Sequence, residues 1–182
     1  VVVTGIVPSA GAVEGSTLVQ VLGSGFRAGS GLGCMFALAA GDGGGSTEMV
    51  TVEGRWETSS MMACVSPRAG VEQTVSVEVS NNGADVTSSG VQFVYERAPT
   101  VTGVGVLERD QGSGGDLVLR VTGKHFVQSP QLRCRMGKGV GMDAARSDAQ
   151  YVSSSEVRCR VDQGRGRGRS AVEVSNNGQD FS

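Results

Sequence analysis

Residues that catalyse reactions and bind metals are scarce in this sequence. It has one histidine, His125, and its four cysteines form no Cys-x-x-Cys pair, so the spacing typical of a zinc site is absent. No serine or cysteine stands at motif spacing from His125, so a general-base role is not expected. The sequence therefore predicts a protein that is not an enzyme and that needs no metal or cofactor.

Long apolar runs and an excess of one charge are also missing. No segment approaches the roughly 20 apolar residues of a membrane span, and no basic-then-apolar signal segment opens the chain. The 182 residues carry 16 basic and 18 acidic side chains, a net charge of −2. Such a balance gives no field that attracts nucleic acid or a membrane surface. We expect no nucleic-acid partner and no direct membrane insertion of this segment.

Aromatic residues are few, which points to small cores. The sequence contains 5 Phe, 2 Tyr and 1 Trp. A fold this poor in aromatics is expected to use Trp56 and Tyr95 in its core. A small domain also gains from a disulfide, typically about 2–4 kcal/mol.

An internal repeat divides the chain. The segment from Val75 to Gly83, which ends in Val-Glu-Val-Ser-Asn-Asn-Gly, recurs between Ala171 and Gly178. Each copy also has a turn ending in Phe and one pair of cysteines. The repeat predicts two domains, residues 1–97 and 98–182, joined near Pro99, which cannot donate to a central strand ladder.

Both repeats alternate apolar and polar residues with a period of two, the pattern of strands with one buried face. The Asn-Asn-Gly segments favour a tight hairpin turn, because Asn and Gly tolerate positive φ. These signals predict two tandem antiparallel β-sandwiches of immunoglobulin-like type, the second lacking its last strand. The predicted inward residues are Val19, Val21, Leu32, Cys34, Phe36, Met62, Cys64, Val75, Val77, Val79, Val91, Phe93 and Tyr95 in repeat one, and Leu119, Val121, Leu132, Cys134, Met136, Val157, Cys159, Val172 and Val174 in repeat two.

The cysteines fall on the inward phase in each repeat, as a bridge within one domain requires. We therefore predict two disulfides, Cys34–Cys64 and Cys134–Cys159. Their even number and matched placement favour an oxidising compartment, either extracellular or in the secretory pathway.

Repeat one resembles the IPT/TIG immunoglobulin-like domain, which occurs in plexins, Met-type receptors and fibrocystin-like proteins and in some transcription factors. The resemblance rests on the opening loop with Pro8, the Gly-Ser-Gly-Phe turn ending at Phe26, and the segments Cys34–Phe36, Met62–Pro67 and Phe93–Tyr95. It implies bridged cysteines, no catalytic residues, and a role as a spacer, adhesion surface or dimerisation module.

Arginines distinguish the second repeat from the first. Repeat one has Gly33, Met35, Ala63 and Val65 where repeat two has arginines. If the two arginine-bearing strands are neighbours, they form one basic stripe. A solvated face and a partner contact both fit such a charge run. We take the contact as the hypothesis; its residues are Arg133, Arg135, Arg158, Arg160, Arg165, Arg167 and Arg169.

The sequence thus predicts a structural or adhesive segment of a larger extracellular protein, such as a cell-surface ectodomain or a filament component. It would space domains and contact protein partners, with a glycan as a further possibility. Two alternatives are a carbohydrate-binding or accessory module of a secreted enzyme and an intracellular module that assists DNA binding. One fold serves many roles, so the fold by itself does not separate the first two hypotheses.

Overall fold

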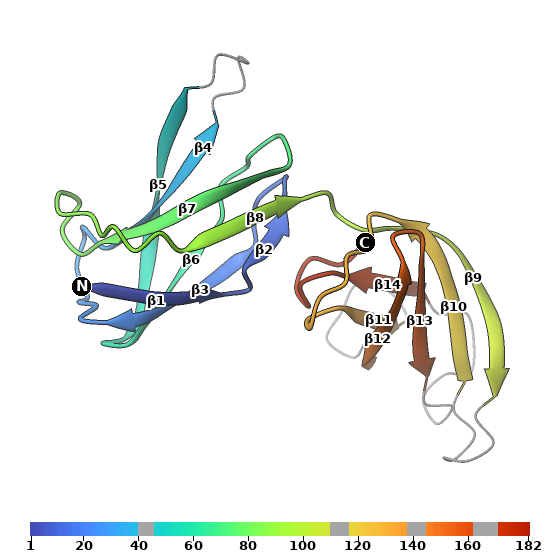
Figure 1. Ribbon diagram of the computed structural model, residues 1–182. Coiled ribbons are helices and arrows are strands. Elements are labelled where there is room, and N and C mark those ends of the chain that lie inside the picture. The colour runs from blue at the N-terminus through green and yellow to red at the C-terminus, as the bar shows by residue number, and fades with distance from the viewer. Residues whose placement is uncertain (40–45, 110–116, 138–144, 162–170) are drawn as a thin grey trace. The chain divides into compact units, whose positions relative to one another are not determined.

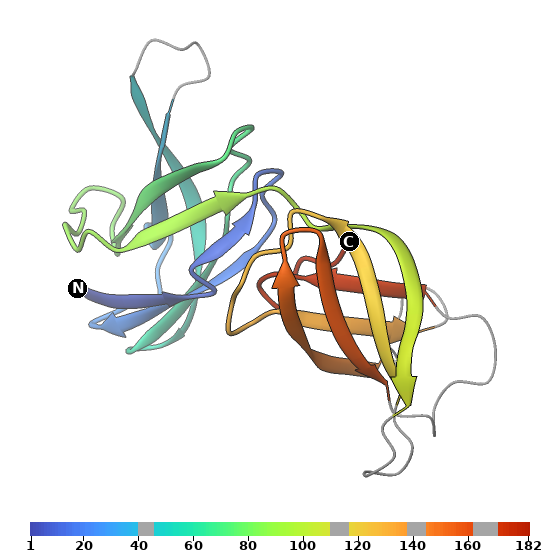
Figure 2. The ribbon, with the colours of Figure 1, turned by 45° about the vertical axis from the view of Figure 1, so that its right-hand side comes forward.

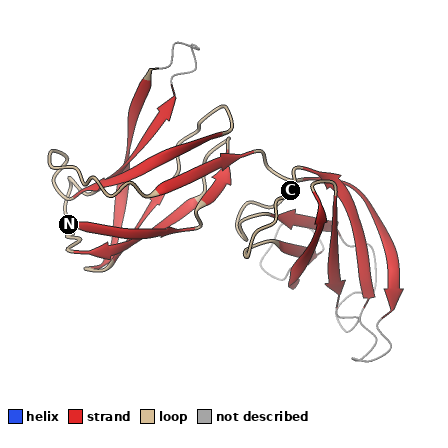
Figure 3. Ribbon diagram, in the orientation of Figure 1, coloured by secondary structure: helices blue, strands red, loops and turns tan. Residues whose placement is uncertain are grey.

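The computed structural model describes residues 1–39, 46–109, 117–137, 145–161 and 171–182. These residues form strands, turns and loops, as Figure 3 shows. None of them belongs to a helix long and apolar enough to span a bilayer. The all-β fold class predicted from the alternating pattern is confirmed.

The chain divides into two compact units, Val1–Arg97 and Ala98–Ser182 (Figure 1). The strands of unit 1 are β1 (Val2–Val7), β2 (Ala10–Ala12), β3 (Leu18–Ser24), β4 (Gly33–Ala39), β5 (Thr47–Thr58), β6 (Met61–Val65), β7 (Gln73–Ser80) and β8 (Gln92–Glu96). The described strands of unit 2 are β9 (Thr100–Arg109), β10 (Leu117–Lys124), β11 (Arg133–Gly137), β12 (Ala145–Ser153), β13 (Glu156–Val161) and β14 (Ala171–Ser175).

In unit 1 the long strand β5 belongs to both layers of the sandwich. Its first half, through Glu53, pairs with β4, and its second half, from Gly54, pairs with β6. The strand order β1-β3-β6-β5-β4-β7-β8-β2 therefore folds into one layer of β1, β3, β6 and β5 and another of β5, β4, β7, β8 and β2. Inward side chains of the two layers meet to form the core, as in immunoglobulin-like sandwiches.

Near its N-terminus the chain changes layer at Pro8. β1 pairs with β3 as far as Val7, and after the cis Val7–Pro8 bond the chain continues as β2, which runs parallel to β8. Proline has no N–H with which to extend the β1 ladder. In unit 2 the position of Pro8 is occupied by Val106, which lies opposite Leu119. There β9 continues along β10 to Arg109.

Unit 2 repeats the plan with strand order β14-β11-β12-β13-β10-β9. β12 pairs with β11 through Asp148 and with β13 from Ala149, so it links the layers as β5 does. Figure 2 shows β9, β10 and β13 side by side in one layer. No strand among the described residues of unit 2 corresponds to β8, as predicted for repeat two. Val104 and Val106 of β9 are 49% and 65% exposed.

All the predicted inward residues belong to the cores of the two units, most of them buried and Val91, Met136 and Val172 partly so. In unit 1 the ring of Phe93 lies edge to face with Phe36 and with Tyr95, with centroids 5.9 and 5.0 Å apart. The prediction for Tyr95 is confirmed, since only 1% of it is exposed.

The prediction for Trp56 is wrong, because this residue lies on β5 where that strand forms the edge of its layer. Trp56 is 44% exposed, and its Nε1 donates to the carbonyl of Phe26 at 3.2 Å. The indole therefore borders the core rather than filling it.

The Asn-Asn-Gly segment begins a loop rather than the predicted tight hairpin. β7 ends at Ser80 and β8 begins only at Gln92. Asn81 reaches the β3–β4 connection, where its Nδ2 donates to Gly25 O at 2.9 Å and its Oδ1 accepts from Arg27 N at 3.2 Å. Side-chain hydrogen bonds of this kind compete with a regular turn.

The second copy of the motif has the same contacts. Asn176 Nδ2 donates to His125 O at 2.8 Å, and its Oδ1 accepts from Val127 N at 3.1 Å. In both units the first asparagine thus fastens the loop that precedes the first cysteine strand. What the two tripeptides share is therefore this contact with the preceding loop and not a tight hairpin turn.

Candidate functional site

The disulfides fix which way the flanking arginines point. Cys34 is bonded to Cys64 and Cys134 to Cys159, with Cα atoms 6.3 and 6.0 Å apart. Each bridge joins the inward faces of two opposite layers. Because side chains alternate along a strand, the residues beside each cysteine face away from the core, on opposite surfaces of the sandwich.

The condition for a single basic stripe is not met. β11 and β13 are not neighbours, since β12 lies between them in the strand order. Arg133 and Arg135 lie on the outer face of the β14-β11-β12 layer, and Arg158 and Arg160 lie on the outer face of the β12-β13-β10-β9 layer. The remaining candidates, Arg165, Arg167 and Arg169, lie outside the described residues.

Arg133 and Arg135 are neutralised within unit 2. Arg135 Nε lies 2.6 Å from Glu173 Oε2, and its guanidinium stacks 4.1 Å from the ring centre of Phe181. Arg133 Nε lies 3.2 Å from Asp148 Oδ1. Its Nη1 donates to the carbonyls of Pro130 and Leu132 at 3.0 and 2.9 Å. This face is a compensated network rather than a free basic surface.

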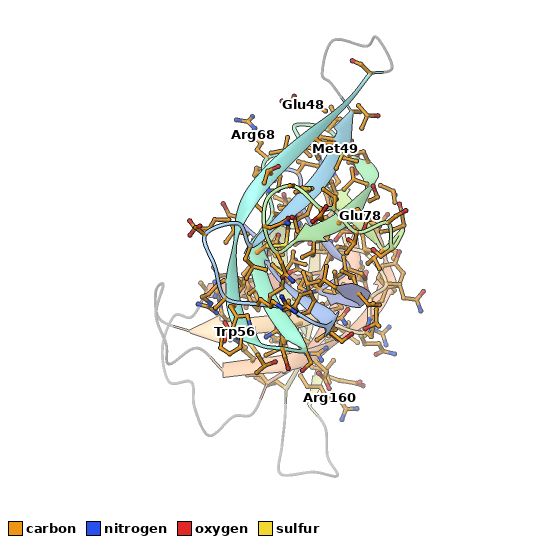
Figure 4. The ribbon with its side chains drawn as sticks, turned by 90° about the vertical axis from the view of Figure 1, so that its left-hand side faces the viewer. Glu48, Met49, Trp56, Arg68, Glu78 and Arg160 are labelled. Atoms are coloured by element: carbon orange, nitrogen blue, oxygen red, sulfur yellow. A yellow bond between two sulfur atoms is a disulfide. The ribbon has the colours of Figure 1, made fainter. Side chains whose placement is uncertain are left out.

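On the outer face of the β12-β13-β10-β9 layer, the described arginines outnumber the acidic side chains that pair with them. Arg120 on β10 stands directly opposite Arg158 on β13, and like charges in this position repel. Glu156 is 2.8 Å from Arg120 Nε. Arg158 Nε is buried with no hydrogen-bond partner among the described residues, and Arg160 is exposed with no ion pair there. In Figure 4 Arg160 projects away from its strand. We call Arg120, Arg158 and Arg160 the β13 arginine face.

Unit 1 folds without any of these charges. The registers place Gln20, Ala63 and Val65 at the positions of Arg120, Arg158 and Arg160. The β13 arginine face is therefore dispensable for building this layer of the sandwich.

Sequence reasoning missed a buried carboxylate, Glu78 on β7. Glu78 is 8% exposed. It accepts hydrogen bonds from Thr87 Oγ1 at 2.6 Å, from Ser89 N and Oγ at 2.8 and 2.9 Å, and from Gly90 N at 2.9 Å. Burial raises the pKa of Glu78, but the bonds from Ser89, Thr87 and Gly90 outweigh it, so its pKa lies below the ordinary value. The Thr-Ser-Ser-Gly run that follows was the available signal.

A metal-binding cluster is absent from the part of the chain that the structure describes. That part holds no group of three or more metal-ligating side chains. A hollow of about 490 Å³ beside β12 is lined by Gln131, Arg133, Arg146, Ser147, Asp148, Asn177 and Gly178. Of its charged groups, Arg133 and Asp148 form an ion pair, and the guanidinium of Arg146 lies 5.5 Å from the ring centre of Phe181.

Comparison with known proteins places this architecture in a family. The sequence model of the IPT/TIG domain matches residues 2–95, the range of unit 1. The chain belongs to the IPT/TIG domain family. No curated protein matches the sequence.

Among solved structures, the chain is similar to the full extracellular region of plexin A4, domains 1 to 10. The TM-score is 0.51 and the identity 17%, over 87% of this chain and 12% of the plexin chain. A second structure of that region, with domains 1 to 8, gives a TM-score of 0.47 and 15% identity over 99% of this chain and 17% of the other. The first likeness supports the IPT/TIG-type fold, and the chain spans only a small part of either plexin chain.

Proposed function

We propose that this chain is a non-catalytic segment of a larger extracellular protein, a cell-surface ectodomain or filament component, in which it spaces domains and contacts protein partners. Membership of the IPT/TIG family and a disulfide in each unit support this role. Disulfides persist in oxidising compartments, which favours the extracellular assignment.

The β13 arginine face carries the proposal of a protein contact. Arg158 and Arg160 lack acidic partners among the described residues, and the equivalent layer of unit 1 has Ala63 and Val65 instead. A guanidinium pairs most strongly with a carboxylate, through two parallel hydrogen bonds. The partner that fits is a protein surface rich in Asp and Glu, for which such a face sets orientation and partner choice more than raw affinity.

A graft from unit 1 tests the contact. Arg158→Ala with Arg160→Val gives unit 2 the residues that unit 1 has, so the melting temperature should stay within a few degrees. Retention on immobilised poly-glutamate at low ionic strength should fall. Arg68→Ala with Lys124→Ser removes the same charge from two exposed sites elsewhere and should leave retention nearly unchanged. Equal retention of graft and wild type, or a large loss of stability in the graft, contradicts the proposal.

The compartment is tested through the cysteines. Peptide mapping without reduction, on protein secreted by eukaryotic cells, should recover Cys34 linked to Cys64 and Cys134 linked to Cys159. The cysteines of each pair are 30 and 25 residues apart, and closing loops of this length in the unfolded chain stabilises the folded state by about 3.5 kcal/mol for each disulfide. Free thiols, or bridges between the units, would count against both the pairing and the extracellular assignment.

A further inference from the structure

The small net charge of the chain conceals two units of opposite sign. Unit 1 has 4 basic and 9 acidic residues, a net of −5, and unit 2 has 12 basic and 9 acidic residues, a net of +3. The acidic residues are equally numerous, so the whole difference lies in the arginines and lysines. Unit 1 therefore has acidic residues without the basic residue that stands beside the equivalent acid in unit 2.

Glu53 is the clearest such acid. The registers pair Gly33 with Glu53 in unit 1 and Arg133 with Asp148 in unit 2, at equivalent positions of β4–β5 and β11–β12. Asp148 is bound by Arg133, whereas Glu53 is exposed and has no partner among the described residues. Gly33 provides no side chain to meet it.

The acceptors that hold Arg133 in unit 2 have counterparts around Gly33. Arg133 contacts the Asp148 carboxylate and the carbonyls of Pro130 and Leu132. At the same offsets, unit 1 has the Glu53 carboxylate and the carbonyls of Ser30 and Leu32. These three acceptors suit a guanidinium, a planar cation with several fixed donors.

Unit 1 cannot readily supply that cation itself. A Cβ added at Gly33 would lie 2.9 Å from the carbonyl oxygen of Val52, which is backbone and cannot swing aside. An arginine in this position of the chain is therefore disfavoured, and the carboxylate faces solution. β5 is an edge strand here, so nothing in its own layer covers it. Figure 4 shows β5 on the outside of unit 1, with Glu48 and Met49 near its beginning.

We propose that Glu53, with the carbonyls of Ser30 and Leu32, is an acceptor site for an arginine from a second copy of this chain, supplied by its β13 arginine face. Charge complementarity selects this occupant, because Arg158 and Arg160 form no ion pair within the described part of unit 2 and because the net charge of unit 2 is opposite to that of unit 1. The contact joins unlike surfaces, unit 1 of one copy to unit 2 of the next, and such heterologous contacts build rings or open filaments. This inference rests on the proposed function and names its partner.

Sedimentation of the full 182-residue chain over a concentration series tests the contact. The wild type should self-associate, and more so at low ionic strength. Glu53→Gln should weaken association about tenfold, the equivalent of one charge-assisted hydrogen bond. Glu53→Asp, which installs the acid that unit 2 uses, should retain most of it. Glu48→Gln removes the same charge from the same strand and is the matched control, expected to change association less than threefold.

Charge reversal in both partners makes the test specific. Arg158→Glu with Arg160→Glu should abolish self-association, as should Glu53→Arg, and an equimolar mixture of these two variants should associate again. A wild type that stays monomeric at every concentration overturns the inference, as does a Glu53→Gln variant that matches Glu48→Gln or a mixture that stays apart. If the chain is monomeric but still binds poly-glutamate through Arg158 and Arg160, only the second-copy partner is lost and the proposed function stands.

Discussion

The corner of β5 offers a test of how each unit fills its core. A Cβ added at Gly54 would overlap Met62 Cε and lie 3.1 Å from Leu32 Cγ and 3.2 Å from Leu32 O. The registers put Ala149 and Val157 at the positions of Gly54 and Met62. Unit 2 therefore has a larger residue than unit 1 at the position of Gly54 and a smaller one at the position of Met62, so the two positions exchange volume.

We expect Gly54→Ala to destabilise unit 1 by about 1–2 kcal/mol. Overpacking costs about 1–3 kcal/mol, and roughly 0.5–1 kcal/mol returns because alanine loses less backbone entropy than glycine. Met62→Val should cost about 1–2 kcal/mol through lost burial and a cavity. In the double variant the added methyl occupies the vacated space, so the double variant should be more stable than the sum of the two costs predicts, by about 1–2 kcal/mol.

Denaturant unfolding followed by tryptophan fluorescence measures these values. Trp56 is the only tryptophan and stands opposite Met62, so the signal reports unit 1 in the intact chain. Met61→Val makes the same chemical change at the next residue, on the other face of β6, and should show no coupling to Gly54→Ala. Additive costs for Gly54→Ala and Met62→Val, within about 0.5 kcal/mol, would refute the exchange of volume.

Two further predictions concern polar groups that hold loops. Glu78→Gln should destabilise unit 1 by about 2–3 kcal/mol at neutral pH. Because the folded pKa of Glu78 is lowered, its stabilisation is present above the unfolded value of about 4.3 and is lost as pH falls through the folded pKa, so the gap between variant and wild type in denaturant titrations should close in acid; a gap independent of pH would argue against this. Asn81→Ala should cost about 1–2 kcal/mol and speed hydrogen exchange at the Arg27 amide, which loses its acceptor. Unchanged exchange there would mean that Asn81 does not fasten the loop.

The period-two pattern predicted the core because inward phase is a local property of a strand. A residue such as Val79 or Cys134 needs only its neighbours in sequence to show which face it occupies. Layer membership is not local. β5 and β12 change layers at Gly54 and Ala149, and no feature of the sequence at these residues indicates the change. For this reason the sequence does not show whether Arg133 and Arg158 share a surface, and the strand order places them on opposite ones.

To predict ion pairs from the sequence, the strand register has to be known as well. Glu53 and Asp148 look alike in sequence, and only the ladder shows that one faces Gly33 and the other Arg133. Alignment of the repeats around their first cysteines does place Gly33 against Arg133, but the partner strand has to be known before the missing ion pair becomes visible. The burial of Glu78 is hidden for a related reason, since the loop that covers it lies beyond the end of β7 in the sequence.

Two copies of one fold in one chain act as controls for each other. Residues that both units keep, such as the cysteines and the first asparagine of each Asn-Asn-Gly, make the same contacts twice and are explained by folding. Where the units differ and the layer is built equally well, folding does not account for the difference. By this criterion Arg158 and Arg160 require an explanation, whereas Arg135 does not, because Glu173 and Phe181 already engage it. Glu53 also requires an explanation, because unit 1 has this acid but has Gly33 where unit 2 has the arginine that would pair with it. The two deficits are complementary, and a contact between copies removes both at once.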